Sequence, residues 1–201
     1  MDNRFLNPIA PIDTQKVRLL LGSGRPYLLF VGVWMSHKNL TRLLDAYRIV
    51  QNVHPDIALV ITGMPVPGYS NLLQYVHDYR LEKDIFFPGF VPHALLPALY
   101  AQACGFVFPS LYEGFGLPPL EAMACGTPVV ASNVSSMPEL LGDAAEYVNP
   151  EDTSDIARGI LRILGDRDYA QELAQRGKIQ AYKYRWALAA AQHVKTYQNA
   201  V

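Results

Sequence analysis

Hydrophobic residues fall into short continuous runs along the chain, separated by segments whose apolar positions recur every three or four residues. The runs lie at residues 27–31, 57–61, 85–87, 106–108, 128–131 and 145–148. Short uninterrupted apolar runs are typical of β-strands that are buried on both faces. In the segment after the first run, one helical stripe is formed by Leu40, Leu43, Leu44, Tyr47 and Val50.

The same helical pattern predicts further helices at residues 13–21, 72–79, 95–103, 118–124, 137–141, 156–164, 169–175 and 186–197. We expect Asp13 to cap the first of these helices and Gly22 to end it. Residues 1–12 contain two prolines and show no period, so they are expected to form a linker.

Strands that alternate with helices predict an α/β fold, a doubly wound parallel sheet with helices on both faces. In such sheets the ligand lies beyond the carboxyl ends of the strands. The loops expected at that edge are residues 32–39, 63–68, 89–93 and 110–117. Function should therefore be sought in these loops.

Composition and charge reduce the classes of binding partner that the chain is expected to have. The 201 residues carry a net charge of −1, so no general basic field is available to attract nucleic acid. The N-terminus lacks the order of a signal peptide, and no apolar run reaches the roughly 18 residues of a spanning helix. We expect a cytoplasmic protein. The basic stretch in residues 176–185 favours a solvated helix face, with peripheral membrane contact as the alternative.

One segment, residues 110–131, concentrates the chemistry. Gly114 and Gly116 lack a Cβ, so their backbone can approach a ligand closely. Pro118 suits a first helical turn, whose free N–H groups favour phosphate or sugar oxygens. Glu121, expected in that same turn, can accept two hydroxyl groups, such as the vicinal pair of a ribose. We expect its carboxylate and that of Glu113 to face one cleft.

The alternative is a purely structural role for this segment, as a tight turn followed by a glutamate at the start of a helix. A capping box would explain Glu121 if a serine or threonine stood three residues earlier. Pro118 occupies that position, which weakens this interpretation.

This segment resembles the E-x7-E signature of glycosyltransferase family 4, with Glu113 and Glu121 as its glutamates. The similarity extends from about residue 26 to residue 186. The further matches, in order, are Phe30-Val31-Gly32 with His37-Lys38-Asn39-Leu40, Phe87-Pro88-Gly89-Phe90-Val91, Gly126-Thr127-Pro128-Val129-Val130-Ala131-Ser132, Pro138-Glu139-Leu140 and Tyr184-Arg185-Trp186.

Members of that family are retaining enzymes with the GT-B architecture, in which two Rossmann-like domains face each other. The resemblance covers only the C-terminal, donor-binding domain. It implies that residues 1–25 are an interdomain connector and that residues 26–201 bind a nucleotide sugar. The acceptor-binding domain is absent from this chain. The full enzyme would move a hexose from a nucleotide diphosphate sugar to a hydroxyl of an acceptor, which in many relatives is lipid-linked.

The resemblance also implies residue roles. Lys38 matches the lysine that contacts the donor phosphate, and Glu121 matches the ribose-binding glutamate. Glu113 matches the glutamate near the donor sugar, which makes Glu113 and Lys38 the candidate catalytic residues. The other donor-binding positions are Gly32 in the phosphate loop, Phe90 and Val91 where main chain meets the base, and Gly114, Phe115, Gly116 and Leu117 in the loop that holds sugar and phosphate.

One position departs from the family pattern. Many members carry an arginine directly after the first-strand glycine, where this chain has Val33. A neutral residue occurs there in a subset that resembles mannosyltransferases, which points toward GDP-mannose as the donor. The alternatives are a GT-B protein of the nucleotide-sugar epimerase type and a non-catalytic nucleotide-binding module.

A second motif, Asp166-Arg167-Asp168, matches the metal-binding triplet of a different glycosyltransferase class. That class needs the triplet directly after a strand, whereas here it lies between two helical segments. We therefore expect it to cap a helix. The family resemblance implies no metal cofactor.

Overall fold

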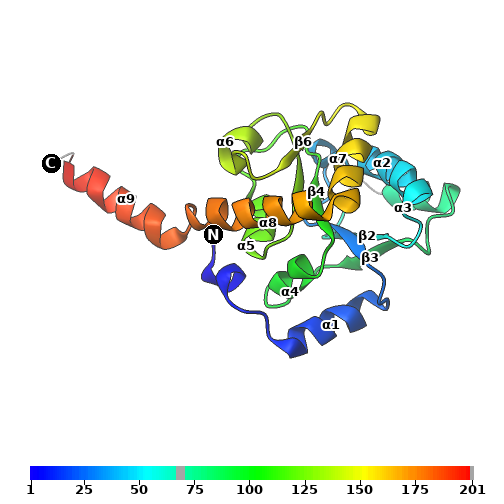
Figure 1. Cartoon of the computed structure of the whole chain (residues 1–201), viewed down its shortest axis with the longest axis horizontal. Coiled ribbons are helices and arrows are strands. Elements are labelled where there is room, and N and C mark those ends of the chain that lie inside the picture. The colour runs from blue at the N-terminus through cyan, green and yellow to red at the C-terminus, as the bar shows by residue number, and fades with distance from the viewer. Residues whose placement is uncertain (67–70, 200–201) are drawn as a thin grey trace.

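The six predicted strands form one parallel sheet in the order β3-β2-β1-β4-β5-β6 (Figure 1). The computed structural model describes residues 1–66 and 71–199 of the chain. The strands are β1 (Tyr27–Phe30), β2 (Ala58–Thr62), β3 (Ile85–Gly89), β4 (Gly105–Phe108), β5 (Val129–Ser132) and β6 (Glu146–Val148). The chain reverses its direction of travel between β1 and β4, so the doubly wound, Rossmann-like fold is confirmed.

Helices connect the strands and cover the sheet. They are α1 (Pro11–Leu21), α2 (Leu40–Val53), α3 (Asn71–Asp78), α4 (Leu96–Ala101), α5 (Leu117–Ala124), α6 (Met137–Leu141), α7 (Thr153–Gly165), α8 (Arg167–Tyr182) and α9 (Trp186–Asn199). Two short 3₁₀ turns, η1 (Asn3–Leu6) and η2 (Ser36–Lys38), complete the described elements. Helix α2 packs against α7, while α5 packs against α4 and α8, and right-handed crossovers place these two groups on opposite faces.

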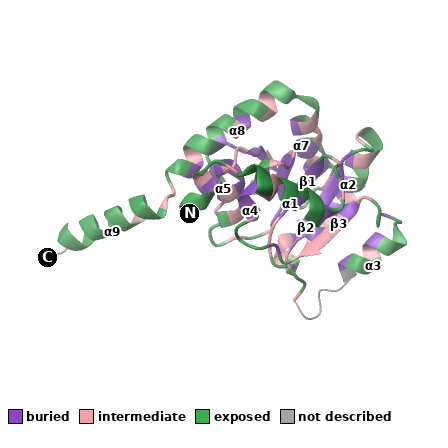
Figure 2. Ribbon diagram, turned by 90° about the horizontal axis from the view of Figure 1, so that it is seen from below, coloured by how far each residue is buried: buried purple, intermediate pink, exposed green. Residues whose placement is uncertain are grey.

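The centre of the sheet is the core of the molecule. Every residue of β1, β2, β4 and β5 is buried, as the continuous apolar runs predict. Each fully buried large aliphatic or aromatic side chain contributes about 1.5–3 kcal/mol of transfer free energy. The purple strands at the middle of Figure 2 show this layer between the helices.

The N-terminal segment is more ordered than its sequence suggests. Residues 1–12 include η1 and the start of α1, so the linker expected there carries helical structure. Met1 and Phe5 are only 3% exposed, and the Phe5 ring meets Tyr100 edge-on at 6.0 Å. These apolar side chains pack on the body of the molecule rather than on their own helix, so they leave no local period.

The start of α1 also differs from the expectation. Ala10 is the N-cap and Pro11 is the first helical residue, two positions before Asp13. Proline at the first position is pre-organised for a helix and loses no hydrogen bond there. The expected end is confirmed, because Gly22 adopts the left-handed conformation at the C-cap.

The C-terminal helices behave in two ways. The Asp166 side chain accepts a hydrogen bond from the Tyr169 N–H at 2.9 Å and caps α8, as predicted. Helix α9 projects away from the sheet (Figures 1 and 2), and none of its described residues is buried. Within the described residues, no helix has the length and apolar character needed to cross a membrane.

Candidate functional site

The carboxyl ends of β1 and β4 bring Lys38 and Glu113 together across 75 residues of sequence. Lys38 Nζ donates to Glu113 Oε1 at 2.6 Å, and the two side chains are only 14% and 11% exposed. The ammonium also lies 5.0 Å from the ring centre of Phe108, the last residue of β4. A partly desolvated ammonium is attracted to an aromatic face as well as to a carboxylate. The fold therefore fixes the lysine head from two sides.

The pairing leaves Lys38 able to bind a further anion. A lysine ammonium has three N–H donors, and the carboxylate of Glu113 uses one of them. Gly32 lies beside the lysine stem, because a Cβ added there would be 3.9 Å from Lys38 Cε. The neighbouring Val33 is 51% exposed and carries no charge.

Asn39 holds this edge of the sheet together. It is 5% exposed and adopts the left-handed conformation with φ 60°. Its side-chain amide donates to the carbonyl of Pro109 at 3.0 Å and to that of Pro150 at 2.7 Å. Leu111 N–H also donates to the His37 carbonyl at 2.7 Å. These bonds tie the loops after β1, β4 and β6 to one another.

The loop after Glu113 presents backbone donors. Among the described residues, we find no acceptor for the N–H groups of Gly114, Phe115, Gly116 and Leu117. Gly116 has φ 106° and is the N-cap of α5, and the next two helical residues after Leu117 are prolines without N–H groups. Unpaired donors at a helix start form a region of positive potential that suits an anion.

Glu121 lies one residue further along α5 than expected. Because the helix begins at Leu117, Glu121 is its fifth residue, and no acidic residue stands in the first turn. Its Oε2 accepts a hydrogen bond from the Tyr100 hydroxyl at 3.0 Å. Burial raises the pKa of the Glu121 carboxyl, against the smaller effect of this hydrogen bond. An ionised Glu121 is thus short of polar partners, and a ligand with two hydroxyls would supply them.

A cavity of about 430 Å³ lies in front of Glu121. It is lined by Met1, Asp2, Arg4, Phe5, His93, Leu117, Glu121 and Trp186. Glu113 is not among these residues. Leu117 lines this cavity and is also the last residue of the loop with unpaired N–H groups, residues 114–117. The cavity therefore lies next to those N–H groups.

The turn after β3 adjoins the same cavity. Phe90 is 70% exposed, whereas Val91 is 5% exposed and belongs to the core. The His93 ring lies 6.4 Å from the Phe90 ring, edge to face, and lines the cavity of Glu121. The structure thus puts this turn near Glu121, although residues 67 and 68 of the preceding predicted loop lie outside the described residues.

Two serines that contact the loop were missed by the sequence analysis. The Ser135 and Ser136 hydroxyls bind the main chain of Glu113, and Ser136 also binds that of Phe115. Two serines directly before a helix would be taken for N-cap residues. Ser136 is the N-cap residue of α6, yet its hydroxyl makes no cap hydrogen bond. The sequence carries no signal that distinguishes a serine that caps a helix from one that binds the main chain of another loop.

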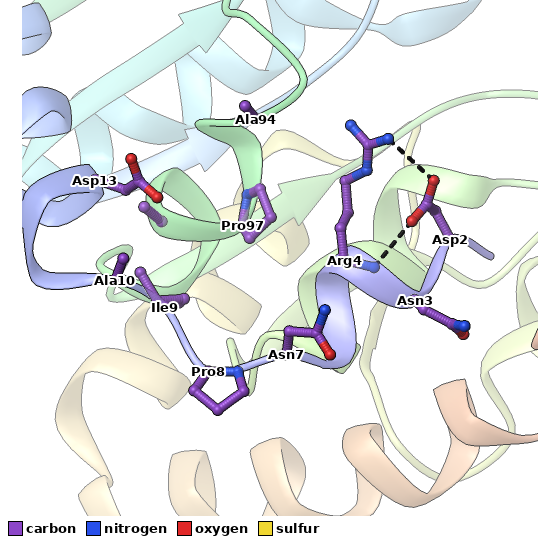
Figure 3. Close-up of a pocket in the computed structure, with 11 residues that line it drawn as sticks. Asp2, Asn3, Arg4, Asn7, Pro8, Ile9, Ala10, Asp13, Ala94 and Pro97 are labelled. Atoms are coloured by element: carbon purple, nitrogen blue, oxygen red, sulfur yellow. Dashed lines mark hydrogen bonds and ion pairs between the residues drawn. The ribbon is translucent and has the colours of Figure 1, made fainter.

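Another cavity, of about 500 Å³, lies between the N-terminal segment and α4 (Figure 3). Asp2 and Arg4 on its wall are paired with each other, as the dashed lines show. None of the predicted site residues lines it. In residues 1–66 and 71–199, no three His, Cys, Asp or Glu side chains gather as a metal site would need.

Comparison with known proteins gives consistent matches. A family model described as glycosyl transferases group 1 matches residues 11–180. The O-antigen chain mannosyltransferase B of Escherichia coli is 39% identical over 173 residues, which are 86% of this chain and 45% of that protein. The chain thus spans about half the length of that relative.

Two solved structures share the fold. Sucrose-phosphate synthase from Thermosynechococcus elongatus is 30% identical with a TM-score of 0.85, over 100% of this chain and 51% of that one. The C-terminal domain of a glycosyl transferase group 1 family protein from Francisella tularensis is 25% identical with a TM-score of 0.79. That match covers 92% of this chain and 97% of the solved domain.

Proposed function

The chain belongs to the glycosyl transferases group 1 family, and from this premise we propose that it is the donor-binding domain of a retaining hexosyltransferase. In this proposal the enzyme is of family 4 and has the GT-B architecture. Residues 26–201 bind the nucleotide sugar, residues 1–25 connect to an acceptor-binding domain, and that domain supplies the acceptor hydroxyl. The Francisella domain, which has nearly the same extent, supports this division.

One observation carries the proposal: a lysine and four unpaired N–H groups flank the same glutamate. Lys38 is held at 2.6 Å from Glu113, and the N–H groups of residues 114–117 follow directly in the chain. Departure of a nucleoside diphosphate from the sugar builds negative charge on its phosphates. Pre-organised donors aimed at that charge stabilise the transition state more than the ground state.

The two glutamates take different parts in this scheme. Glu113 lies beside the charged lysine and would face the sugar, where positive character develops as the phosphate leaves. Glu121 lines the neighbouring cavity and would accept the two ribose hydroxyls. The positions of Phe90 and Val91 near that cavity support a main-chain contact to the base. No residue of this scheme requires a metal cofactor.

We further propose that the donor is GDP-mannose and that mannose is transferred to a hydroxyl of an acceptor sugar, of which a lipid-linked sugar is one form. Two proteins from E. coli that are 39% and 35% identical to this chain are named mannosyltransferases. The neutral Val33 beside the phosphate loop agrees with the sequence subset that resembles those enzymes.

The test is calorimetry of the chain with GDP, UDP and ADP in a buffer that contains EDTA. We expect weak binding, tightest for GDP, and a loss of about tenfold to a hundredfold in Lys38→Ala, because charge-assisted hydrogen bonds contribute about 1.5–3 kcal/mol. Lys195→Ala, on the exposed helix α9, is the matched control and should bind like the wild type.

The outcomes separate the parts of the proposal. The absence of heat with all three nucleotides would overturn donor binding, and equal affinity for GDP and UDP would overturn the choice of GDP-mannose. Incubation with GDP-mannose and a sugar acceptor should give no transfer. Transfer by this chain alone would contradict the need for a second domain.

A further inference from the structure

The turn between β5 and α6 grips the loop that carries Glu113. Ser135 Oγ accepts from the Glu113 N–H at 3.2 Å and donates to the Glu113 carbonyl at 2.7 Å. Ser136 Oγ lies 3.0 Å from the same carbonyl and 2.8 Å from that of Phe115. Two adjacent hydroxyls therefore contact three backbone groups of a loop that is more than 20 positions away in the sequence.

The conformation of this turn is specific. Ser135 has φ 60°, in the left-handed region that non-glycine residues rarely adopt. Ser136 is the N-cap residue of α6, but its hydroxyl points to the loop and makes no cap bond. A turn in which one residue keeps a disfavoured conformation and the next leaves a helix end uncapped is held by other contacts. In this turn those contacts are the hydrogen bonds of both hydroxyls to the loop.

The same helix fixes the far end of the loop. A Cβ added to Gly116 would lie 2.4 Å from Met137 Cε and 3.4 Å from Leu140 Cδ2. The start of α6 thus contacts the loop from Glu113 to Gly116, through hydroxyls at one end and through apolar side chains at the other. This contact orients the Glu113 side chain toward Lys38 and leaves the N–H groups of residues 114–117 unpaired.

We propose that Ser135 and Ser136 are positioning residues for the donor loop. They hold the Glu113 and Phe115 carbonyls, so that the Lys38–Glu113 pair and the free N–H groups keep one arrangement before the donor arrives. Pre-organised donors bind an anion more tightly because the loop does not have to be ordered at that moment. This inference rests on the proposed function for the identity of the ligand, but not for the state of the empty loop.

The test compares five variants with the wild type: two single variants, their double variant and two controls. Ser135→Gly keeps the left-handed conformation accessible and removes one hydroxyl, and Ser136→Ala removes the other. Ser136→Thr retains a hydroxyl and is the rescue variant. Ser154→Ala is the matched control, since Ser154 is exposed and its hydroxyl binds no residue that the structure describes.

Two readouts are needed. In the empty protein, hydrogen exchange at the Glu113 amide, which donates to Ser135 Oγ, should be faster in Ser135→Gly/Ser136→Ala than in the wild type, and unchanged in Ser136→Thr and Ser154→Ala. Affinity for GDP in EDTA should fall about tenfold in the double variant, since each hydrogen bond contributes about 1 kcal/mol or less. A melting temperature close to that of the wild type would show that the fold is intact.

The results decide each claim separately. Unchanged exchange in the double variant would overturn the positioning role, as would accelerated exchange with unchanged GDP affinity. If the wild type binds none of the nucleotides, the proposed function fails, and exchange in the empty loop still decides whether the serines position it. Should the double variant not fold, Ser136→Ala carries the test, because its ordinary backbone conformation tolerates alanine.

Discussion

Two glutamates that stand eight positions apart in the sequence have opposite electrostatic surroundings in the folded chain. Glu113 has the Lys38 ammonium at 2.6 Å. The Glu121 carboxylate accepts a hydrogen bond from the Tyr100 hydroxyl at 3.0 Å, and burial raises the pKa of its carboxyl. The E-x7-E spacing alone treats the two residues alike, because a motif reports identity and distance along the chain but not the neighbours.

The raised pKa of Glu121 predicts a pH-dependent stability. The folded state holds the Glu121 proton to higher pH than the unfolded state, so the charge opposes folding once the pH rises above the ordinary carboxyl pKa. Glutamine has no charge and can still accept the Tyr100 hydrogen bond. We therefore expect Glu121→Gln to unfold at higher urea concentration than the wild type at pH 7, with a smaller gain at pH 4.

The matched control is Glu151→Gln, at an exposed position before α7. Its difference from the wild type should be small at both pH values. A gain for Glu121→Gln that is the same at pH 4 and pH 7 would show that the carboxyl charge is not its cause.

At the scale of elements, the edge of the sheet is set by how closely the loops after β1 and β2 approach each other. Gly63 has φ 94°, and a Cβ there would lie 2.0 Å from the Gly32 carbonyl oxygen. Trp34 crosses the same gap, since its N–H donates to the Met64 carbonyl and its Nε1 to the Thr62 carbonyl, both at 3.0 Å. The conformation of the loop that contains Gly32 therefore depends on the neighbouring loop.

This contact predicts a severe effect of Gly63→Ala. The new methyl group overlaps backbone atoms and sits in a left-handed conformation, so we expect a loss of about 3 kcal/mol or more in the free energy of unfolding. Gly165→Ala, at the end of α7, is the control. A Cβ added to Gly165 would have no atom of a more distant described residue within 4 Å. It should be neutral or stabilising by up to about 1 kcal/mol. Equal urea midpoints for the two variants would contradict the close approach.

Local sequence signals located the elements well but not their first residues. The runs at 106–108 and 128–131 correspond to β4 and β5, since a buried strand is continuous in hydrophobicity. Helix α5 begins at Leu117, one residue before the predicted start, with Gly116 as its N-cap. Glu121 therefore lies beyond the first helical turn, in which it was expected.

At the scale of the whole molecule, one buried carboxylate joins the C-terminal helices to the edge of the sheet. Glu146 on β6 is 3% exposed and lies 2.5 Å from Arg158, 3.0 Å from Arg162 and 2.5 Å from the Tyr169 hydroxyl. These partners come from α7 and α8. A single side chain thus connects three elements that follow one another in the chain.

We predict that Glu146→Gln lowers the free energy of unfolding by about 2 kcal/mol, because it removes the charge that satisfies two guanidinium groups and a hydroxyl. The matched control is Glu172→Gln, which breaks the Arg176–Glu172 pair between exposed side chains on α8. Exposed pairs contribute about 0–1 kcal/mol, so this variant should differ little from the wild type. Equal losses in the two variants, measured by urea unfolding, would refute the role of burial.

The sequence by itself determined the strands, most helices, the doubly wound sheet and the edge where ligands bind. These follow from hydrophobic period and from glycine and proline positions, which act over a few residues. Only the tertiary structure decided that Lys38 pairs with Glu113, that Glu121 faces its own cavity and that Ser135 and Ser136 hold the loop. Those contacts join residues from different strand ends, and their free energy depends on distances that no local pattern encodes.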